Sequence, residues 1–207
     1  MNASLQDDPS PSCDNVPVAV AERHVHLTQD VIEQLFCDKY HLHEHARASQ
    51  PTQFAAREVV TLVGPGGRLA NVRVIGPPRA HNQIEISRTD AATLGVRAPQ
   101  RESGDLKDTP GIFVEGPRTG VRLDHGVIRT LRHVHMTPEH ANRIGVKDRG
   151  LVDVVSASAH RRTVFCDVLV RVTVDCVSEL HIDADESEAA GLYSGSLVEL
   201  RRNLTHD

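Results

Sequence analysis

One six-residue segment occurs twice in this chain of 207 residues, and this repetition limits how the chain can fold. The first copy, Arg-His-Val-His-Leu-Thr, covers residues 23–28, and the second, Arg-His-Val-His-Met-Thr, covers residues 132–137. The copies differ only where Leu27 is replaced by Met136. A repeat of this kind indicates that two halves of the chain are related by internal duplication.

Each copy ends in a residue that suits the start of a helix, and two further segments carry the same signal. The four expected N-caps are Thr28, Ser87, Thr137 and Asp183. Three of the four units continue to a glycine that suits a left-handed C-cap, namely Gly95, Gly145 and Gly191, whereas Phe36 takes this place in the first unit. We expect four short helices built from one repeated unit.

Most of the remaining chain has the pattern of β-strands. Residues 59–63 and 72–75 are rich in valine and flank the turn sequence Gly-Pro-Gly-Gly, which predicts a β-hairpin. Similar apolar stretches cover residues 112–114, 121–123, 152–155 and 164–174. The sequence therefore predicts a mainly β fold with few, short helices.

Composition excludes several classes of protein. Hydrophobic residues make up 39% and charged residues 25%, which is typical of a soluble globular protein, and no apolar run approaches the ~20 residues of a membrane span. The net charge is −5, aromatic residues make up 3% and tryptophan is absent, so we expect no nucleic-acid partner. The first residues have no secretory signal pattern, so the expected compartment is the cytoplasm.

The cysteines do not suggest a site. Cys13, Cys37, Cys166 and Cys176 are widely spaced and form no Cys-x-x-Cys pair, so we interpret them as reduced thiols. The sequence also has no Gly-x-Ser-x-Gly segment. A covalent acyl-enzyme is therefore disfavoured.

The duplicated His-Val-His segments predict metal ligands. Residues i and i+2 of a strand point to the same face, so His24 pairs with His26 and His133 pairs with His135. Two neighbouring imidazoles suit one zinc ion when both are neutral. A single His-x-His segment is more often surface histidine than ligand, but two copies in matched context favour the metal site.

The repeat also predicts the third ligand of each site. His26 and His135 lie two residues before their N-caps, and the same place in the other two units is taken by Glu85 and His181. We therefore expect one zinc bound by His24, His26 and Glu85 and a second bound by His133, His135 and His181. Three protein ligands leave a coordination position open, as in catalytic zinc sites.

Two arginines are candidates for binding phosphate, whereas the other histidines are not assigned to a site. Arg79 and Arg88 flank Glu85, and either guanidinium could bind phosphate, although for Arg88 a surface role is an equal alternative. We interpret residues 38–53 as a solvated loop, including His41, His43 and His45. The remaining histidines are assigned to the surface, namely His81, His125, His140, His160 and His206.

These residues together resemble the PduL-type phosphate propanoyltransferases, a phosphotransacylase family. The resemblance runs from about residue 16 to residue 200. The matching stretches are residues 16–18, 23–27, 53–56, 85–90, 101–107, 132–137 and 180–183.

The resemblance implies two small β-barrel domains capped by short α-helices, with two zinc ions between them. It implies a strand at 16–22 that completes the second barrel, with a first barrel at 23–130 and a second at 131–207. Residues 1–15 are polar and contain Pro9 and Pro11, so we expect them to form a disordered lead. The implied reaction exchanges acyl-CoA and phosphate for acyl phosphate and coenzyme A. The implied residues are the phosphate-contacting Arg79 and the zinc ligands His24, His26, Glu85, His133, His135 and His181.

Several alternatives stay open from the sequence. A two-zinc hydrolase would cleave a thioester or phosphoester with water, and a non-catalytic metal-binding or assembly protein would use zinc only to hold its fold. The choice between propanoyl and acetyl groups, the formation of a homo-oligomer, and association with a bacterial microcompartment are also open. Residues 1–15 show no amphipathic pattern of the kind found in microcompartment targeting peptides.

Overall fold

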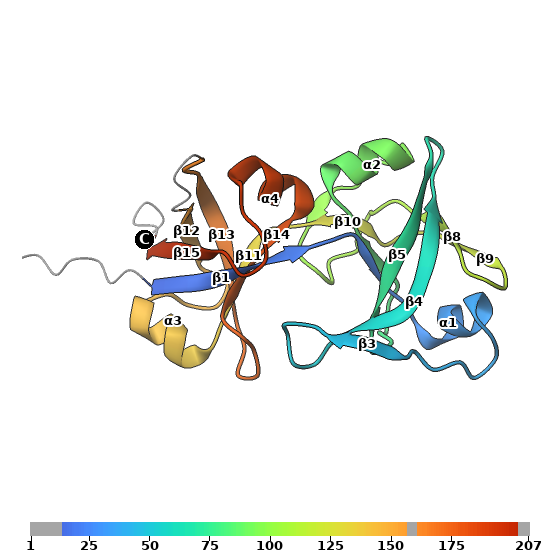
Figure 1. Cartoon of the computed structure of the whole chain (residues 1–207), viewed down its shortest axis with the longest axis horizontal. Helices are drawn as coiled ribbons and strands as arrows, with labels where there is room; N and C mark the ends of the chain where they lie inside the picture. The colour runs from blue at the N-terminus through green and yellow to red at the C-terminus, as the bar shows by residue number, and fades with distance from the viewer. Residues whose placement is uncertain (1–13, 157–160, 203–207) are drawn as a thin grey trace, which may run out of the picture.

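A computed structural model describes residues 14–156 and 161–202, which form two β units joined side by side (Figure 1). One unit, called here the curled sheet, has nine strands, and the other, called the barrel, is closed from six. Both are accompanied by short helices. The mainly β fold with short helices that the sequence predicts is confirmed.

The barrel is built from both ends of the described chain. Its strands follow the order β1-β14-β11-β13-β12-β15 and close into a ring. Their bounds are β1 (Asp14–Ala21), β11 (His133–Met136), β12 (Leu151–Ser156), β13 (Val164–Val172), β14 (Glu179–Asp183) and β15 (Leu197–Arg202). β1 pairs in parallel with β14 and antiparallel with β15, so the first strand of the chain closes the barrel formed by the last ones.

The curled sheet lies between β1 and β11 in the sequence and does not close into a ring. Its strand order is β7-β10-β6-β2-β5-β4-β8-β9, with β3 paired to β4. The strands are β2 (His24–His26), β3 (Glu44–Arg47), β4 (Phe54–Val63), β5 (Arg68–Gly76), β6 (Gln83–Glu85), β7 (Gln100–Arg101), β8 (Ile112–Glu115), β9 (Gly120–Leu123) and β10 (Val127–Thr130). The domain limits expected at residues 22 and 130 stay a prediction. Of the expected lead, residues 1–13 lie outside the described residues, and β1 begins at Asp14.

The four helices of the described residues have seven residues each and begin where the sequence predicts. They are α1 (Gln29–Leu35), α2 (Arg88–Leu94), α3 (Pro138–Ile144) and α4 (Ala184–Ala190). The expected caps accept hydrogen bonds from backbone N–H groups of the first turn, and Ser87 and Asp183 form capping boxes. Three helices end at a left-handed glycine, whereas α1 ends at Phe36 in a right-handed conformation.

The duplication extends to an ion pair in each half. Arg23 precedes the first His-Val-His segment and lies 2.9 Å from Asp90 of α2, and Arg132 precedes the second and lies 3.0 Å from Glu186 of α4. Asp90 and Glu186 are the matching capping-box residues of their helices. Each arginine therefore ties its histidine strand to the helix that follows the third candidate ligand.

Each unit has its own apolar core. Val25, Ile84 and Leu62 are fully buried in the curled sheet, and Val134 and Leu180 are fully buried in the barrel. Val25 and Val134 are the central residues of the two His-Val-His segments, so their side chains face the cores while the histidines face the other way. Burial of the valines thus fixes the direction of the imidazoles.

The Gly-Pro-Gly-Gly turn has a packing role beyond joining two strands. Gly66 donates a backbone hydrogen bond of 2.9 Å to the carbonyl of Leu94, at the end of α2. A Cβ atom on Gly95 would lie 2.7 Å from the Gly66 nitrogen. Because the two backbones approach so closely, neither position has room for a larger residue.

The structure corrects two assignments made for the other histidines. His140 is only 7% exposed, because α3 packs it against the barrel near Asp14, so it is not a surface residue. Residues 44–47 form β3 rather than a loop, since they pair with β4. His160 and His206 lie outside the described residues.

Within residues 14–156 and 161–202, none of the helices has the length and apolar character required to cross a membrane.

Candidate active site

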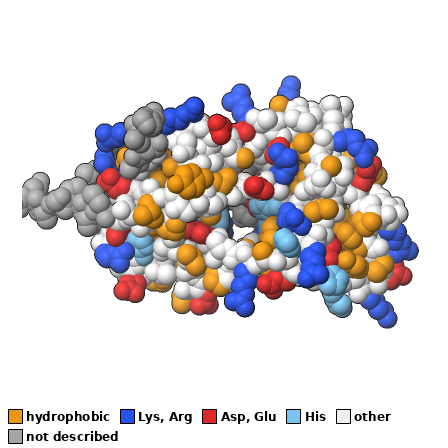
Figure 2. Space-filling model, viewed as in Figure 1, with side chains coloured by type: hydrophobic (Ala, Val, Ile, Leu, Met, Phe, Trp, Pro, Cys, Tyr) orange, Lys and Arg blue, Asp and Glu red, His pale blue; other side chains and the backbone are white. Residues whose placement is uncertain are grey.

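A cavity of about 640 Å³ lies where the curled sheet meets the barrel. Figure 2 shows the molecule hollowed near its centre, with histidine and basic side chains near the opening. His24 and Glu85 line the cavity from the curled sheet, and His133 and His181 line it from the barrel. The two candidate metal sites therefore share one space.

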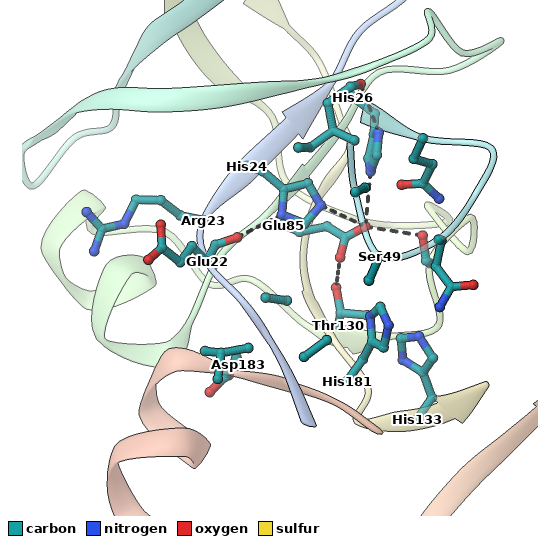
Figure 3. A pocket seen from close by; sticks show the side chains of 18 of the residues that line it. Glu22, Arg23, His24, His26, Ser49, Glu85, Thr130, His133, His181 and Asp183 are labelled. Atoms are coloured by element: carbon teal, nitrogen blue, oxygen red, sulfur yellow. Dashed lines mark hydrogen bonds and ion pairs between the residues drawn. The ribbon is translucent and has the colours of Figure 1, made fainter. Parts of the chain in front are cut away.

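The first cluster combines His24 and His26 from β2 with Glu85 from β6 (Figure 3). β2 and β6 are antiparallel neighbours, and their register places His24 directly opposite Glu85. The Nε2 atoms of both histidines lie 3.7 Å from Oε1 of Glu85. One ligand atom from each residue lies within 4.8 Å of the others, as a shared metal ion requires.

Hydrogen bonds orient the imidazoles of this cluster. Nδ1 of His24 donates to the carbonyl of Glu22 at 2.8 Å, and Nδ1 of His26 donates to the carbonyl of Ile75 at 3.3 Å. A carbonyl only accepts, so the proton of each neutral ring sits on Nδ1 and the lone pair of Nε2 is free for a metal. Glu85 is held by the hydroxyl of Thr130.

The second cluster combines His133 and His135 from β11 with His181 from β14. These strands are also antiparallel neighbours, and His133 lies opposite His181. The three ring centroids are 4.9 Å apart in every pair. Nδ1 of His133 donates to the carbonyl of Leu131 at 2.9 Å, which repeats the arrangement of His24 in the first cluster.

Burial keeps three of the five imidazoles, those of His26, His133 and His135, neutral at pH 7. Burial lowers the pKa of His133 to about 3, with a further contribution from His181. Burial also lowers the pKa of His26 to about 3 and that of His135 to about 4. A neutral imidazole is the form that binds a metal ion, so burial prepares His26, His133 and His135 to act as ligands.

His24 and Glu85 form the charged part of the first cluster. Burial lowers the pKa of His24, but the Glu85 carboxylate outweighs burial and the net shift is upward. Burial raises the pKa of Glu85, but His24 and His26 outweigh it and hold the pKa well below the ordinary value. Glu85 is thus an anionic ligand type at neutral pH.

The donor set fits zinc. The Nε2 atoms of His133 and His135 lie 3.2 Å apart, and two nitrogens bound to one tetrahedral zinc at ~2.0–2.1 Å lie roughly 3.3 Å apart. Nδ1 of His135 is buried without a hydrogen-bond partner among the described residues. Three imidazoles, or two imidazoles and a carboxylate, are ligand sets that zinc accepts.

Two arginines add positive charge to the cavity. Arg79 lines it from the curled sheet, as expected from the sequence, whereas Arg88 is exposed and is not part of the lining. Arg171 of β13 lines it from the barrel, in register with His135 on the neighbouring strand. Within the described part of the chain, neither Arg79 nor Arg171 forms an ion pair with a carboxylate, so both are free to bind an anion.

Sequence reasoning missed Arg171, Glu179 and Gln50. Glu179 accepts a 2.7 Å hydrogen bond from Nε2 of His181, and Gln50 donates a 2.6 Å hydrogen bond to Glu179. The segment Glu-Leu-His places Glu179 on the same strand face as His181, which is a signal that could have identified it. Gln50 carries no comparable signal, because it reaches the barrel from the distant loop between β3 and β4.

Comparison with known proteins identifies the class as acyltransferases. A phosphate propanoyltransferase of Thermotoga maritima is 50% identical over 181 residues, which cover 87% of this chain and 86% of that protein. Phosphate propanoyltransferases of Salmonella typhimurium and Rhodobacter capsulatus are 46% and 45% identical, over 85% and 90% of this chain and 83% and 86% of their own lengths.

The family follows from a match over most of the chain. The family model described as phosphate propanoyltransferase matches residues 17–193, which include Arg79 and the six candidate metal ligands named from the sequence. The chain belongs to the phosphate propanoyltransferase family.

Proposed function

We propose that this protein transfers a short acyl group, propanoyl or acetyl, reversibly between coenzyme A and inorganic phosphate at a two-zinc site. The observation that carries this proposal is the shared cavity, which holds two clusters of three metal-ligand side chains together with Arg79 and Arg171. Metal ions and unpaired guanidinium groups are both suited to binding phosphate and to stabilising negative charge as it develops in a reaction.

The proposed ligands are His24, His26 and Glu85 for one ion, and His133, His135 and His181 for the other. Zinc bound there supplies a Lewis acid that neutralises negative charge on phosphate and on the reacting carbonyl oxygen.

Arg79 has the proposed role of orienting phosphate. Its guanidinium donates hydrogen bonds to two phosphate oxygens at once, which orients one of the remaining two oxygens toward the thioester. Burial lowers the pKa of Arg79, but an arginine stays protonated at neutral pH and keeps its charge. Arg171, which lines the cavity from the barrel, reduces the repulsion between phosphate and the phosphate groups of coenzyme A.

The proposed reaction is a direct displacement. An oxygen of phosphate forms a bond to the thioester carbonyl carbon, the carbon–sulfur bond breaks, and its electron pair leaves with the sulfur of coenzyme A. The acyl group passes directly to phosphate and at no stage forms a covalent bond to the protein. Cys166 and Cys176 support this, because neither is among the residues that line the cavity.

The test is to incubate the purified protein with propanoyl-CoA, with and without phosphate, and to measure free thiol and acyl phosphate together. The proposal predicts that both products appear in equal amounts and only when phosphate is present. Release of thiol without phosphate would instead identify a hydrolase, and no release from propanoyl-CoA or acetyl-CoA would favour a binding protein.

A further inference from the structure

The residue two positions before the third candidate ligand is polar and buried in both halves of the molecule. Gln83 precedes Glu85 on β6 and is 2% exposed, and Glu179 precedes His181 on β14 and is 4% exposed. The strand registers place Gln83 opposite His26 and Glu179 opposite His135. Gln83 and Glu179 therefore occupy equivalent positions in the duplicated arrangement.

Both residues bind the ligand that follows them, with complementary chemistry. The amide of Gln83 donates a hydrogen bond to the carboxylate of Glu85. The carboxylate of Glu179 accepts a 2.7 Å hydrogen bond from Nε2 of His181. Where the third ligand is an acceptor its partner is a donor, and where the third ligand is a donor its partner is an acceptor.

Each partner is itself fixed in place. The Gln83 amide nitrogen lies 2.8 Å from Oγ of Ser103, and its amide oxygen accepts a 2.8 Å hydrogen bond from the backbone of Gly104. Glu179 accepts a 2.6 Å hydrogen bond from Gln50, which also donates to the carbonyl of Val177 at 3.2 Å. Gln50 comes from the curled sheet, so one unit helps to fix a ligand of the other.

A structural role alone does not explain these buried groups. A buried carboxylate costs folding free energy unless it is well paired, and an apolar residue at either position would fill the space without that cost. The arrangement matches the outer hydrogen bonds that orient metal-binding side chains and set their basicity.

We propose that Gln83 and Glu179 are matched positioning residues, each serving one of the two zinc clusters, and that Gln50 of the curled sheet supports Glu179 of the barrel. This inference rests on the two-zinc site of the proposed function. Each residue acts on a single ion, because its hydrogen bond reaches the third ligand of its own cluster only.

The test measures zinc affinity in metal-free protein by competition with a coloured chelator, and zinc content by elemental analysis. It uses variants with one cluster removed. In H26A, which retains the barrel cluster, adding E179A should weaken zinc binding about 10- to 100-fold, whereas adding Q83A should leave it unchanged. In H133A, which retains the cluster of the curled sheet, adding Q83A should weaken zinc binding by a similar factor, whereas adding E179A should leave it unchanged.

Two further variants separate positioning from folding. E179Q keeps an acceptor for His181 and should lose less affinity than E179A. Glu58 is a matched control, because it is also a buried glutamate and accepts a 2.8 Å hydrogen bond from His43 outside the cavity. E58A should lower the thermal unfolding midpoint without changing zinc affinity in either background.

The outcomes distinguish this inference from the proposal on which it rests. A wild-type chain that binds no zinc would overturn the metal site and the inference with it. Two ions in wild-type protein, with E179A weakening both clusters equally or neither, would overturn the positioning role alone.

Discussion

His133 lies directly opposite His181 on the neighbouring strand β14, as His24 lies directly opposite Glu85 on β6. In both halves the third candidate ligand thus comes from the antiparallel neighbour of the His-Val-His strand. The register of a strand pair is fixed by burial of one face, and here the alternate residues Val134 and Leu180 are fully buried. The core of each unit therefore determines the geometry of its cluster.

Replacing Arg79 with alanine should raise the KM for phosphate and lower kcat/KM about 10- to 100-fold, since a hydrogen bond to a charged group contributes about 1.5–3 kcal/mol. Arg88 provides the control because it is exposed and lies outside the cavity lining, so R88A should have little effect. Steady-state kinetics with varied phosphate would check both variants. Equal losses in R79A and R88A would contradict the role of Arg79.

Replacing His133 with alanine should remove zinc from the barrel cluster and lower turnover by at least about 100-fold, because two ligands bind zinc weakly. H125A is the control, since His125 is exposed and is not part of the cavity. Zinc content and turnover would be measured on the same preparations. Full activity in H133A protein that has demonstrably lost this zinc would show that the barrel cluster is not catalytic.

Acid should destabilise the metal-free protein. The folded pKa of His133 and of His26 is about 3, below the ordinary 6.5, so between these values the unfolded chain binds more protons than the folded one. Stability is then present above pH 6.5 and is lost as the pH falls, by about 1.4 kcal/mol per pH unit for each such imidazole. His24, whose pKa is raised, acts in the opposite direction.

The measurement is the thermal unfolding midpoint of chelator-treated protein between pH 7.5 and pH 5. H133Q removes one of the titrating groups, so its midpoint should fall less steeply toward acid than that of the wild type. Identical slopes for the two proteins would show that burial of His133 does not cause the acid sensitivity.

Two C-cap glycines should differ in their tolerance of alanine. Both have a left-handed backbone, with φ of 67° at Gly95 and 73° at Gly145, so alanine costs about 1–2 kcal/mol at either position. An added Cβ at Gly95 would also lie 2.7 Å from the Gly66 nitrogen, whereas at Gly145 the nearest atom is a flexible Arg202 nitrogen at 3.7 Å. Urea unfolding should show a clearly larger loss of free energy in G95A. Equal losses would mean that the turn at Gly66 moves away without cost.

The repeated segments made much of this architecture predictable from the sequence. The helix caps, three of the helix ends and the candidate ligands all follow from local residue chemistry combined with one internal alignment. That alignment was needed because Glu85 and His181 are far in sequence from the histidines they approach, and no local spacing relates them.

Other features depend on tertiary packing and have no local pattern. Gln50 crosses from the loop after β3 to the barrel, and Arg171 reaches the cavity because β13 pairs with β11. His140 is buried because α3 packs its N-terminal turn against the start of β1. The sequence showed polar residues at these positions without showing which surfaces would cover them.

The most direct test of the account is a zinc titration of the metal-free protein with propanoyl-CoA and phosphate present. The account predicts that free thiol and acyl phosphate are formed in a 1:1 ratio and that the rate rises until each chain has bound two zinc ions. Undiminished formation of both products in the metal-free protein, or thiol release without acyl phosphate, would contradict it.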